Sequence, residues 1–245
     1  MTATATASIV STAELHRTYG EGEAAVHALR GITIGFPAGE FTAIMGPSGS
    51  GKSTLMHLLA GLDRPTSGSV VVDGQELANL DDKRLTSLRR DKLGFVFQAF
   101  NLIPVLTARE NITLPLMLAG KKVEDSWFDT VVDAVGLGDR LTHRPAELSG
   151  GQQQRVAIAR ALIARPAVVF ADEPTGNLDS KSAGDVLDLL RRAVDDFGQT
   201  VIMVTHDAGA AAAADRVVLL RDGLVVHDGA AESADALLDL MKQVA

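Results

Sequence analysis

The sequence predicts an α/β fold with a mostly parallel sheet, an antiparallel strand pair near the N-terminus and an inserted helical region. One observation behind this prediction is that apolar runs typical of strands alternate with helical patterns, as they do from 168 to 204. Another is the glycine-rich segment that joins an expected strand at 41–45 to an expected helix at 52–60. The third is the continuously apolar run Val168–Asp172, because strands buried on both faces of a parallel sheet lack polar alternation.

The composition is that of an ordinary globular protein, since 46% of the 245 residues are apolar and 22% are charged. This length permits one large domain or two small ones. A net charge of −8 disfavours broad attraction to nucleic acid, so we expect no nucleic-acid partner. Without cysteine there is no disulfide and no thiolate metal site. We expect no membrane helix, which needs about 18 apolar residues in a row, and no secretory signal in residues 1–8.

Two strands, Ile9–Leu15 and Leu29–Phe36, are expected to pair antiparallel at the start of the chain. Tyr19, the only tyrosine, is expected in the connection between them. An aromatic ring in a loop can stack on the base of a nucleotide, and it can equally well pack against its own protein. Both interpretations of Tyr19 stay open at this point.

The segment from 46 to 54 has the composition of a phosphate-binding loop. Its glycines let successive backbone N–H groups turn toward an anion, and the helix that begins near Lys52 adds the positive end of its dipole. Lys52 is expected to reach the β- and γ-phosphates of a nucleotide, and Ser53 to bind Mg²⁺. A plain Gly/Ser turn is the alternative, but the flanking strand and helix are those that the motif requires. The loop comprises Gly46, Pro47, Ser48, Gly49, Ser50, Gly51, Lys52, Ser53 and Thr54.

The next part of the chain is expected to hold strands at 69–73 and 93–97, on either side of a polar helix at 81–91. Gln98 stands at the end of the second strand. Its amide could bind Mg²⁺ or a metal-bound water, or it could be an ordinary loop amide.

From 101 to 164 the pattern is helical, and prolines and glycines, among them Pro115, are expected to break it into separate helices. Trp127 and Phe128 fall at helical spacing with three valines, so we expect them in the core.

A long helix is expected to begin at Ser149, Gly150, Gly151 and Gln152. A helix start of this composition is a second candidate anion site. The signal is weak by itself, because serine and glycine commonly begin helices.

Acidic and imidazole side chains follow two of the expected parallel strands, at the ends where ligands bind in open α/β sheets. Asp172 is expected to hold Mg²⁺ through water, and Glu173 to act as the base or to orient the water that attacks a γ-phosphate. His206, after the strand at 200–204, is expected to hydrogen-bond the γ-phosphate and that water. Solvated turn acids and a surface histidine are the alternatives. The remaining elements are expected at 182–197 (helix), 216–221 and 224–227 (strands), and 232–244 (helix).

Taken together, these motifs resemble the ATP-binding-cassette (ABC) ATPases, in the family's order and over nearly the entire chain. The segments at 93–102, 106–111, 148–156 and 171–179 resemble the macrolide-exporter and lipoprotein-release branch in particular, with the cell-division branch a near relative. The motifs are Gly46–Thr54, Gln98, Leu148–Gln152, Val168–Glu173, Asn177–Asp179 and His206.

The resemblance implies a P-loop NTPase (RecA-like) fold in a single domain over 1–245. Its catalytic core with the β subdomain would cover about 9–98 and 156–230, its helical subdomain about 99–155, and a C-terminal helix about 232–244.

The resemblance also implies an ATPase that uses ATP with Mg²⁺ and works as a head-to-tail dimer. In that dimer, Ser149–Gln152 of one copy would cover the γ-phosphate bound to the loop of the other, and Asp179 would lie across the same interface. Lys52, Glu173 and His206 would be catalytic, and Tyr19 would stack on adenine. Ser53, Gln98 and Asp172 would hold the metal, with Gln98 linking it to the helical subdomain.

The region Phe97–Ala119 corresponds to the surface that receives a membrane permease in this family. The expectation is therefore a subunit at the cytoplasmic face of the membrane, peripheral through a separate permease chain. Two other functions stay open: an ABC-type ATPase that acts on DNA or ribosomes, and a P-loop kinase for a small molecule, which would have no use for Ser149–Gly151 or Asp179.

Overall fold

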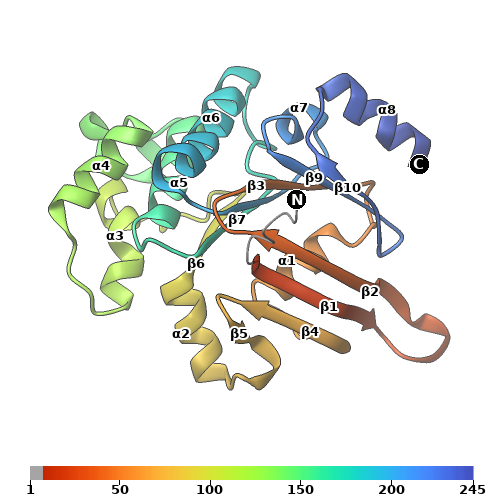
Figure 1. The fold of residues 1–245 in the computed structure, drawn as a ribbon. Helices are drawn as coiled ribbons and strands as arrows, with labels where there is room; N and C mark the ends of the chain where they lie inside the picture. The colour runs from red at the N-terminus through yellow and green to blue at the C-terminus, as the bar shows by residue number, and fades with distance from the viewer. Residues whose placement is uncertain (1–7, 245) are drawn as a thin grey trace, which may run out of the picture.

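The computed structural model describes residues 8–244, and the prediction for the first seven residues lies outside this range. An antiparallel sheet with the strand order β2-β1-β4-β5 forms one side of the molecule (Figure 1). Its strands are β1 (Ser8–Tyr19), β2 (Val26–Pro37), β4 (Ser67–Val72) and β5 (Gln75–Glu76), with a short 3₁₀ turn at Gly22–Ala24 between the first two. The predicted early strand pair is confirmed. The placement of Tyr19 in the connection was wrong: both strands run further than predicted, and Tyr19 is the last residue of β1, where it pairs with Val26.

A second, six-stranded sheet forms the centre of the molecule, in the order β10-β9-β3-β8-β7-β6. Its strands are β3 (Phe41–Met45), β6 (Leu93–Phe97), β7 (Val168–Asp172), β8 (Val201–Val204), β9 (Arg216–Arg221) and β10 (Leu224–Ala230). All neighbours are parallel except β9 and β10, which form a hairpin. The mostly parallel α/β fold with an antiparallel N-terminal sheet is thus confirmed. The carboxyl ends of β3, β7 and β8 meet at one edge, where the chain can gather ligand-binding groups.

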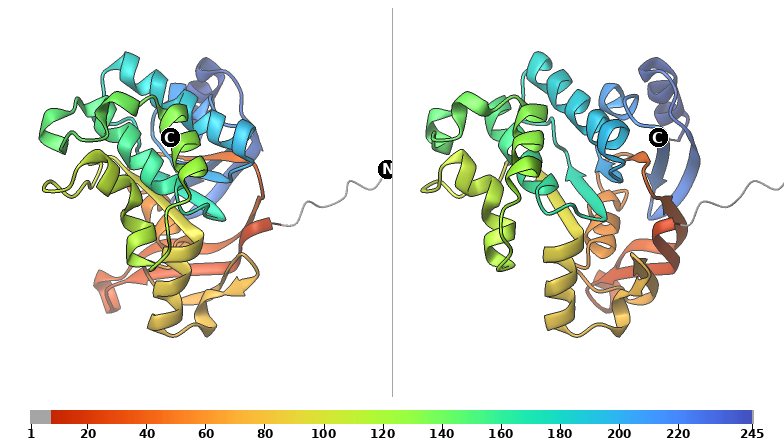
Figure 2. Two further views of the ribbon diagram at one scale, coloured as in Figure 1. Left: turned by 90° about the vertical axis from the view of Figure 1, so that its left-hand side faces the viewer. Right: turned by 60° about the vertical axis from the view of Figure 1, so that its left-hand side comes forward.

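Helices cover both faces of the central sheet. Figures 1 and 2 show α3 to α6 gathered on one side of the molecule, away from the antiparallel sheet. The long helices are α1 (Lys52–Leu59), α2 (Asp82–Lys92), α3 (Ala108–Leu118), α4 (Asp125–Val135), α5 (Gly150–Leu162), α6 (Ser180–Phe197) and α8 (Ala234–Val244); α7 (Ala208–Ala211) is a single turn. Three short 3₁₀ turns lie at Leu77–Asn79, Gly138–Arg140 and Pro145–Glu147.

Several predicted helix bounds differ from the structure; α8, for example, begins at Ala234 and not at 232. Pro115 lies inside α3 and does not end it, because the helix closes only three residues later and the N–H of Ala119 still reaches the Pro115 carbonyl. Helix α6 begins at Ser180, two residues earlier than predicted, because the Asp179 side chain accepts a hydrogen bond from Ser182 N and caps the first turn.

The core consists of two layers, one on each face of the central sheet, and the strands alternate between them. Along β7, Val169 and Ala171 join the layer under α3 to α8, whereas Val168 and Phe170 join the layer under α1 and the antiparallel sheet. Phe128 is buried as predicted, whereas Trp127 is only partly buried. None of the helices in residues 8–244 combines the length and apolar character that crossing a bilayer requires.

Candidate functional site

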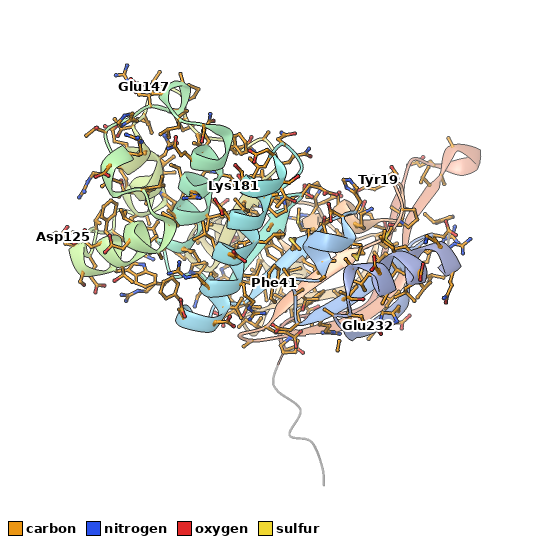
Figure 3. All side chains as sticks on the ribbon, turned by 90° about the horizontal axis from the view of Figure 1, so that it is seen from above. Tyr19, Phe41, Asp125, Glu147, Lys181 and Glu232 are labelled. Carbon is orange, nitrogen blue, oxygen red and sulfur yellow. The ribbon has the colours of Figure 1, made fainter. Side chains whose placement is uncertain are left out.

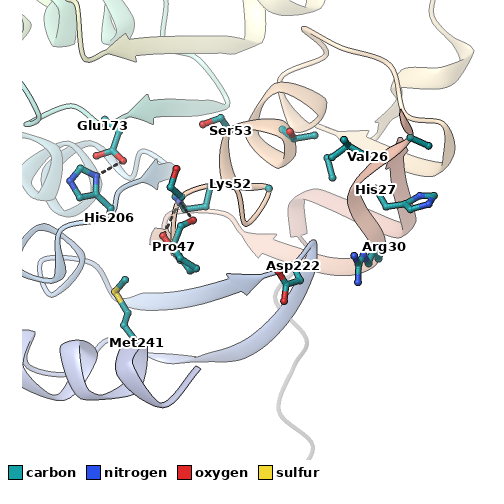
Figure 4. A pocket seen from close by; sticks show the side chains of 17 residues that line it. Val26, His27, Arg30, Pro47, Lys52, Ser53, Glu173, His206, Asp222 and Met241 are labelled. Carbon is teal, nitrogen blue, oxygen red and sulfur yellow. Dashed lines mark hydrogen bonds and ion pairs between the residues drawn. The ribbon is translucent and has the colours of Figure 1, made fainter. Parts of the chain in front are cut away.

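The predicted phosphate loop joins the end of β3 to the start of α1 and lines a cavity of about 1030 Å³ (Figure 4). The backbone is left-handed at Gly46, Gly49 and Gly51, and a Cβ at Gly46 would collide with the Leu220 carbonyl. Left-handed residues of this kind let successive backbone N–H groups face one side, as an anion cradle requires. Every loop residue from Gly46 to Thr54 lines the cavity except Ser50, which is buried beneath it.

Two observations test whether this loop fits a bound phosphate. The hydroxyl of Ser50 is buried and has no hydrogen-bond partner. The half-buried ammonium of Lys52 donates to the carbonyls of Gly46, at 2.8 Å, and Pro47, at 2.9 Å. Burial lowers the pKa of Lys52, while the negative charges of Glu173 and Asp172 oppose that shift. The hydrogen-bond partners of this half-buried cation are uncharged backbone carbonyls. The residues present therefore fit an anionic ligand.

The ends of β7 and β8 bring the acidic and imidazole groups to the same cavity. Asp172 pairs in register with Val204, and Glu173 donates its N–H to the Val204 carbonyl at 2.9 Å. Glu173 has a left-handed backbone (φ 46°), which is uncommon outside glycine and asparagine. Glu173 and His206 line the cavity and contact each other, as Figure 4 shows.

Asp172 is half-buried beside these groups. Burial raises the pKa of its carboxyl, and the charge of His57 offsets part of that rise. Glu173 raises the same pKa and Lys52 lowers it, each by less. A nearby cation would favour the ionised form of this carboxyl, because an opposite charge lowers the pKa of an acid. Asp172 is not among the residues that line the cavity, whereas Ser53 is. The carboxylate and the hydroxyl offer oxygen atoms, which are the ligands that Mg²⁺ prefers.

Gln98 follows β6, as predicted, but its side chain is engaged elsewhere. Its amide nitrogen donates to Oδ1 of Asn177 at 3.0 Å, and the Asn177 amide donates to the Gln98 carbonyl at 3.1 Å. Gln98 is not among the residues that line the cavity. The structure therefore ties Gln98 to the loop before Asp179 rather than to the phosphate loop.

The second candidate anion site lies apart from the cavity. Ser149 caps α5: its hydroxyl accepts from Gln152 N at 3.3 Å, and the Gln152 amide oxygen accepts from Ser149 N at 2.9 Å. Neither these residues nor Gly150, Gly151 and Asp179 line the cavity. In Figure 3, Glu147, just before this helix start, and Tyr19 lie in widely separated parts of the molecule.

Tyr19 also lies outside the cavity lining. Its hydroxyl donates to Asp63 at 2.9 Å, and the guanidinium of Arg17 lies 4.4 Å from the centre of its ring. Its ring is partly exposed. Stacking on adenine remains a prediction that these contacts leave open.

Sequence reasoning missed several residues that line the cavity. Val26, His27 and Arg30 come from the start of β2, Asp222 from the β9–β10 turn, and Met241 from α8. They lie far apart in the sequence, and no motif marks them. The pairing of β2 with the β9–β10 turn, through the bond from Arg30 N to the Gly223 carbonyl, and the packing of α8 bring them to the loop.

Comparisons with known proteins agree with this geometry. A family model described as "ABC transporter" matches residues 29–176. A macrolide export ATP-binding/permease protein, MacB, from Marinobacter nauticus is 48% identical over 93% of this chain, and an uncharacterized ABC transporter ATP-binding protein from Thermotoga maritima is 47% identical over 89%. The match covers 36% of the first relative and 93% of the second, so the chain spans about a third of the MacB protein.

Solved structures have the same fold. The dimeric ATP-binding cassette MJ0796, in a post-hydrolysis state with ADP and Pi bound, is 42% identical, with a TM-score of 0.81 over 91% of this chain and 99% of that one. CbiO1 of Clostridium perfringens, part of an ABC transporter complex, is 29% identical, with a TM-score of 0.83 over 97% of this chain and 94% of that one. The family model covers more than half of the chain, and these relatives agree with it: the chain belongs to the ABC transporter family, as an ATP-binding cassette.

Proposed function

We propose that this chain powers a separate membrane permease through ATP-driven head-to-tail dimerisation. Its family makes it an ATPase that uses ATP with Mg²⁺. The observation that carries the proposal is the separation, within one chain, of two groups built to bind one nucleotide. The loop at 46–54 lines the cavity, whereas the helix start at Ser149–Gly151 does not.

A second copy supplies what one chain lacks. The exposed cap of α5 in one copy would cover the γ-phosphate held by the loop of the other, and Asp179, also exposed, would face the same interface. The relative MJ0796 is a dimer with ADP and Pi bound, which supports this arrangement. In closed symmetric dimers, each copy contributes the same two surfaces, so two equivalent sites would form.

The chemistry assigned to the chain's own residues follows from their positions. Lys52 would exchange its two carbonyl partners for phosphate oxygens and neutralise their charge. Glu173 would take the proton of the attacking water, and His206 would hold Glu173 and that water in line. Ser53 and Asp172 would hold Mg²⁺, which supplies charge neutralisation between the β- and γ-phosphates when bound.

A permease surface is proposed over the region Phe97–Ala119. Four apolar side chains of this region are exposed: Ile103, Val105, Met117 and Leu118. Beside them lies a groove of about 460 Å³ whose lining is mostly apolar, with arginines from α2 and α5 at its margin. Exposed apolar side chains gathered at a groove indicate a binding surface for another protein.

Two finer points extend the proposal. MacB is a macrolide exporter, and we place this chain in the branch that also includes lipoprotein release, which leaves the transported substance to the permease. We also propose that the helical region of about 99–155 moves as a unit against the catalytic core of about 9–98 and 156–230, with α8 as a separate C-terminal element.

Mixed variants test the shared site. Lys52→Ala damages the loop, and Ser149→Arg blocks the helix start; each variant alone should lack ATPase activity. In their heterodimer, one of the two sites has both defects and the other has neither. A one-to-one mixture should therefore regain up to about a quarter of the wild-type phosphate release, since half of the dimers are mixed.

The matched control is the doubly substituted chain mixed with the Lys52→Ala chain, in which every site carries the Lys52 defect, so no phosphate release should be regained. No recovery in the first mixture would contradict the shared site. Release of a phosphorylated small molecule instead of free phosphate would support a kinase, and retention on DNA at physiological salt would support the nucleic-acid alternative.

A further inference from the structure

The turn after Gln98 has an unusual backbone. Phe100 and Asn101 are consecutive and both left-handed, with φ of 60° and 50°. Such a conformation is uncommon for a bulky residue such as phenylalanine. A chain that keeps two such residues in sequence needs contacts that hold them.

Arg160 of α5 makes these contacts. Its two terminal nitrogens donate to the carbonyls of Asn101, at 2.6 Å, and Phe100, at 2.9 Å. Among the ion pairs of residues 8–244, none pairs Arg160 with a carboxylate. The side chain of Arg160 is partly buried, and this burial lowers the pKa of its guanidinium. A cation in this position is suited to holding backbone dipoles, because the planar fork matches two adjacent carbonyls.

The same turn also contacts the other end of α5. A Cβ added at Gly150 would lie 3.7 Å from Cζ of Phe100 and 3.5 Å from Leu178. The ring of Phe100 thus reaches the first residue of α5, while its carbonyl is held from Arg160 near the last turn. Phe100 therefore touches the start of α5 directly and is hydrogen-bonded to a side chain that comes from near the end of the same helix.

On its other side the turn leads into the proposed permease surface. Arg160 and Asn101 line the groove beside that surface, and Ile103, two residues after Asn101, is one of its exposed side chains. Phe100 and Asn101 are therefore the link between the α5 start and the groove.

We propose that Arg160 is a positioning residue that locks the Phe100–Asn101 turn onto α5, so that a displacement of Gly150 by the partner's nucleotide reaches the permease surface. The inference rests on the proposed function, because the nucleotide at Gly150 belongs to the second copy. Arg160 touches no substrate in this scheme. It keeps α5 and the turn moving together.

Hydrogen exchange of backbone amides tests the inference without the permease. The background is Glu173→Gln, which is expected to hold Mg-ATP without turnover. Arg160→Gln and Arg160→Lys are compared with the control Arg165→Gln. Arg165 follows α5 as well, but its guanidinium lies over Trp127 and pairs with Glu124 at 3.2 Å.

Mg-ATP should protect the amides of 46–54 and of 98–106 in the background protein and in the Arg165→Gln control. With Arg160→Gln, protection of 46–54 should remain and that of 98–106 should be lost. Arg160→Lys should regain part of the second effect, because an ammonium reaches one carbonyl where the guanidinium reaches two. A role in stability alone would change both segments alike, with and without ATP.

Full ATP-dependent protection of 98–106 in Arg160→Gln overturns the inference, as does an equal loss in Arg165→Gln. If Arg160→Gln does not fold, Arg160→Lys decides the question by the same comparison. Absence of any ATP-dependent protection in the background protein overturns the proposed function itself, and the inference with it.

Discussion

Nδ1 of His206 lies 2.8 Å from Oε1 of Glu173, across the ends of two adjacent parallel strands. The two side chains differ in their surroundings: that of His206 is 71% exposed, whereas that of Glu173 is 20% exposed. Glu173 is therefore fixed by the fold, whereas His206 is placed chiefly by this contact. A base held from one side and open toward the loop is the arrangement that water activation requires.

Glu173→Gln should retain ATP binding and lose turnover by about 10²- to 10⁴-fold, since general base catalysis contributes that much. The amide keeps the size of the side chain and can still bond His206, so the fold should be unchanged. Phosphate release and size-exclusion chromatography with Mg-ATP are the measurements, and the variant should accumulate as a dimer. Near-normal phosphate release would remove Glu173 from the role of base.

Asp172→Asn should make the chain more stable when ATP and Mg²⁺ are absent. Burial raises the pKa of the Asp172 carboxyl in the folded state. A raised pKa means that its contribution to stability is full below the unfolded pKa and is lost as the pH rises through the folded pKa. At neutral pH the ionised carboxylate therefore lowers stability, and asparagine removes that cost; the difference should shrink in acid.

The same variant should need about 10- to 100-fold more Mg²⁺ for half-maximal turnover, because the carboxylate is expected to hold the metal through water. Thermal unfolding between pH 4 and pH 8 and a magnesium titration of phosphate release provide the two readouts. Thermal stability below that of wild type at neutral pH would show that the charged form of Asp172 is stabilising. An unchanged magnesium requirement would remove it from the metal site.

Val105→Asp should weaken attachment to the permease about tenfold or more and leave basal ATP hydrolysis unchanged. Val105 is 73% exposed, so the charge costs the fold little. By contrast, Leu102, in the same segment, packs against the core, so a charge there would disturb folding. The readout is the share of the chain recovered with membranes of its native host, with Leu238→Asp on α8 as the control. Equal membrane recovery of the two variants would move the permease surface elsewhere.

Asp91→Asn should lower stability at pH 7 by about 1 kcal/mol, a figure reduced for solvent screening. The hydrogen bond from Arg90 lowers the pKa of Asp91 to about 2, with Lys121 adding to the shift against the effect of burial. A lowered pKa means that the stability is present above the unfolded pKa, near 3.8, and is lost as the pH falls through about 2.

Urea unfolding of Asp91→Asn and wild type should therefore differ at pH 7 and converge toward pH 2. Asp82→Asn is the control, because Asp82 pairs with Arg64 at a site where both side chains are exposed. A gap that persists at the acid end would show that the loss comes from packing and not from charge.

Much of the fold could be predicted because the central strands are buried on both faces. Val168–Asp172 reads as an uninterrupted apolar run for that reason, and its bounds were predicted correctly. The loop at 46–54 was found because its chemistry needs glycines at fixed spacing. The predicted helix break at Pro115 was wrong, because a proline near the end of a helix removes one hydrogen bond without ending the helix.

The rest of the site depends on tertiary packing that no local pattern records. Asp222 and Met241 reach the cavity only because the β9–β10 hairpin and α8 fold back on it. The reciprocal amide contacts of Gln98 and Asn177 join residues 79 positions apart. The role of Arg160 could not be predicted, because its sequence neighbours indicate only a helix and the turn that it contacts lies about 60 residues earlier in the chain.

The two bonds of the Lys52 ammonium to its own loop make nucleotide capture a competition. An incoming phosphate must displace the carbonyls of Gly46 and Pro47 before it gains the lysine, so the affinity of the loop is a difference between two sets of charge-assisted bonds. After hydrolysis the same carbonyls are at hand to take the ammonium back. The loop carbonyls are thus an internal competitor for the Lys52 ammonium, whose partners would change each time a phosphate enters or leaves.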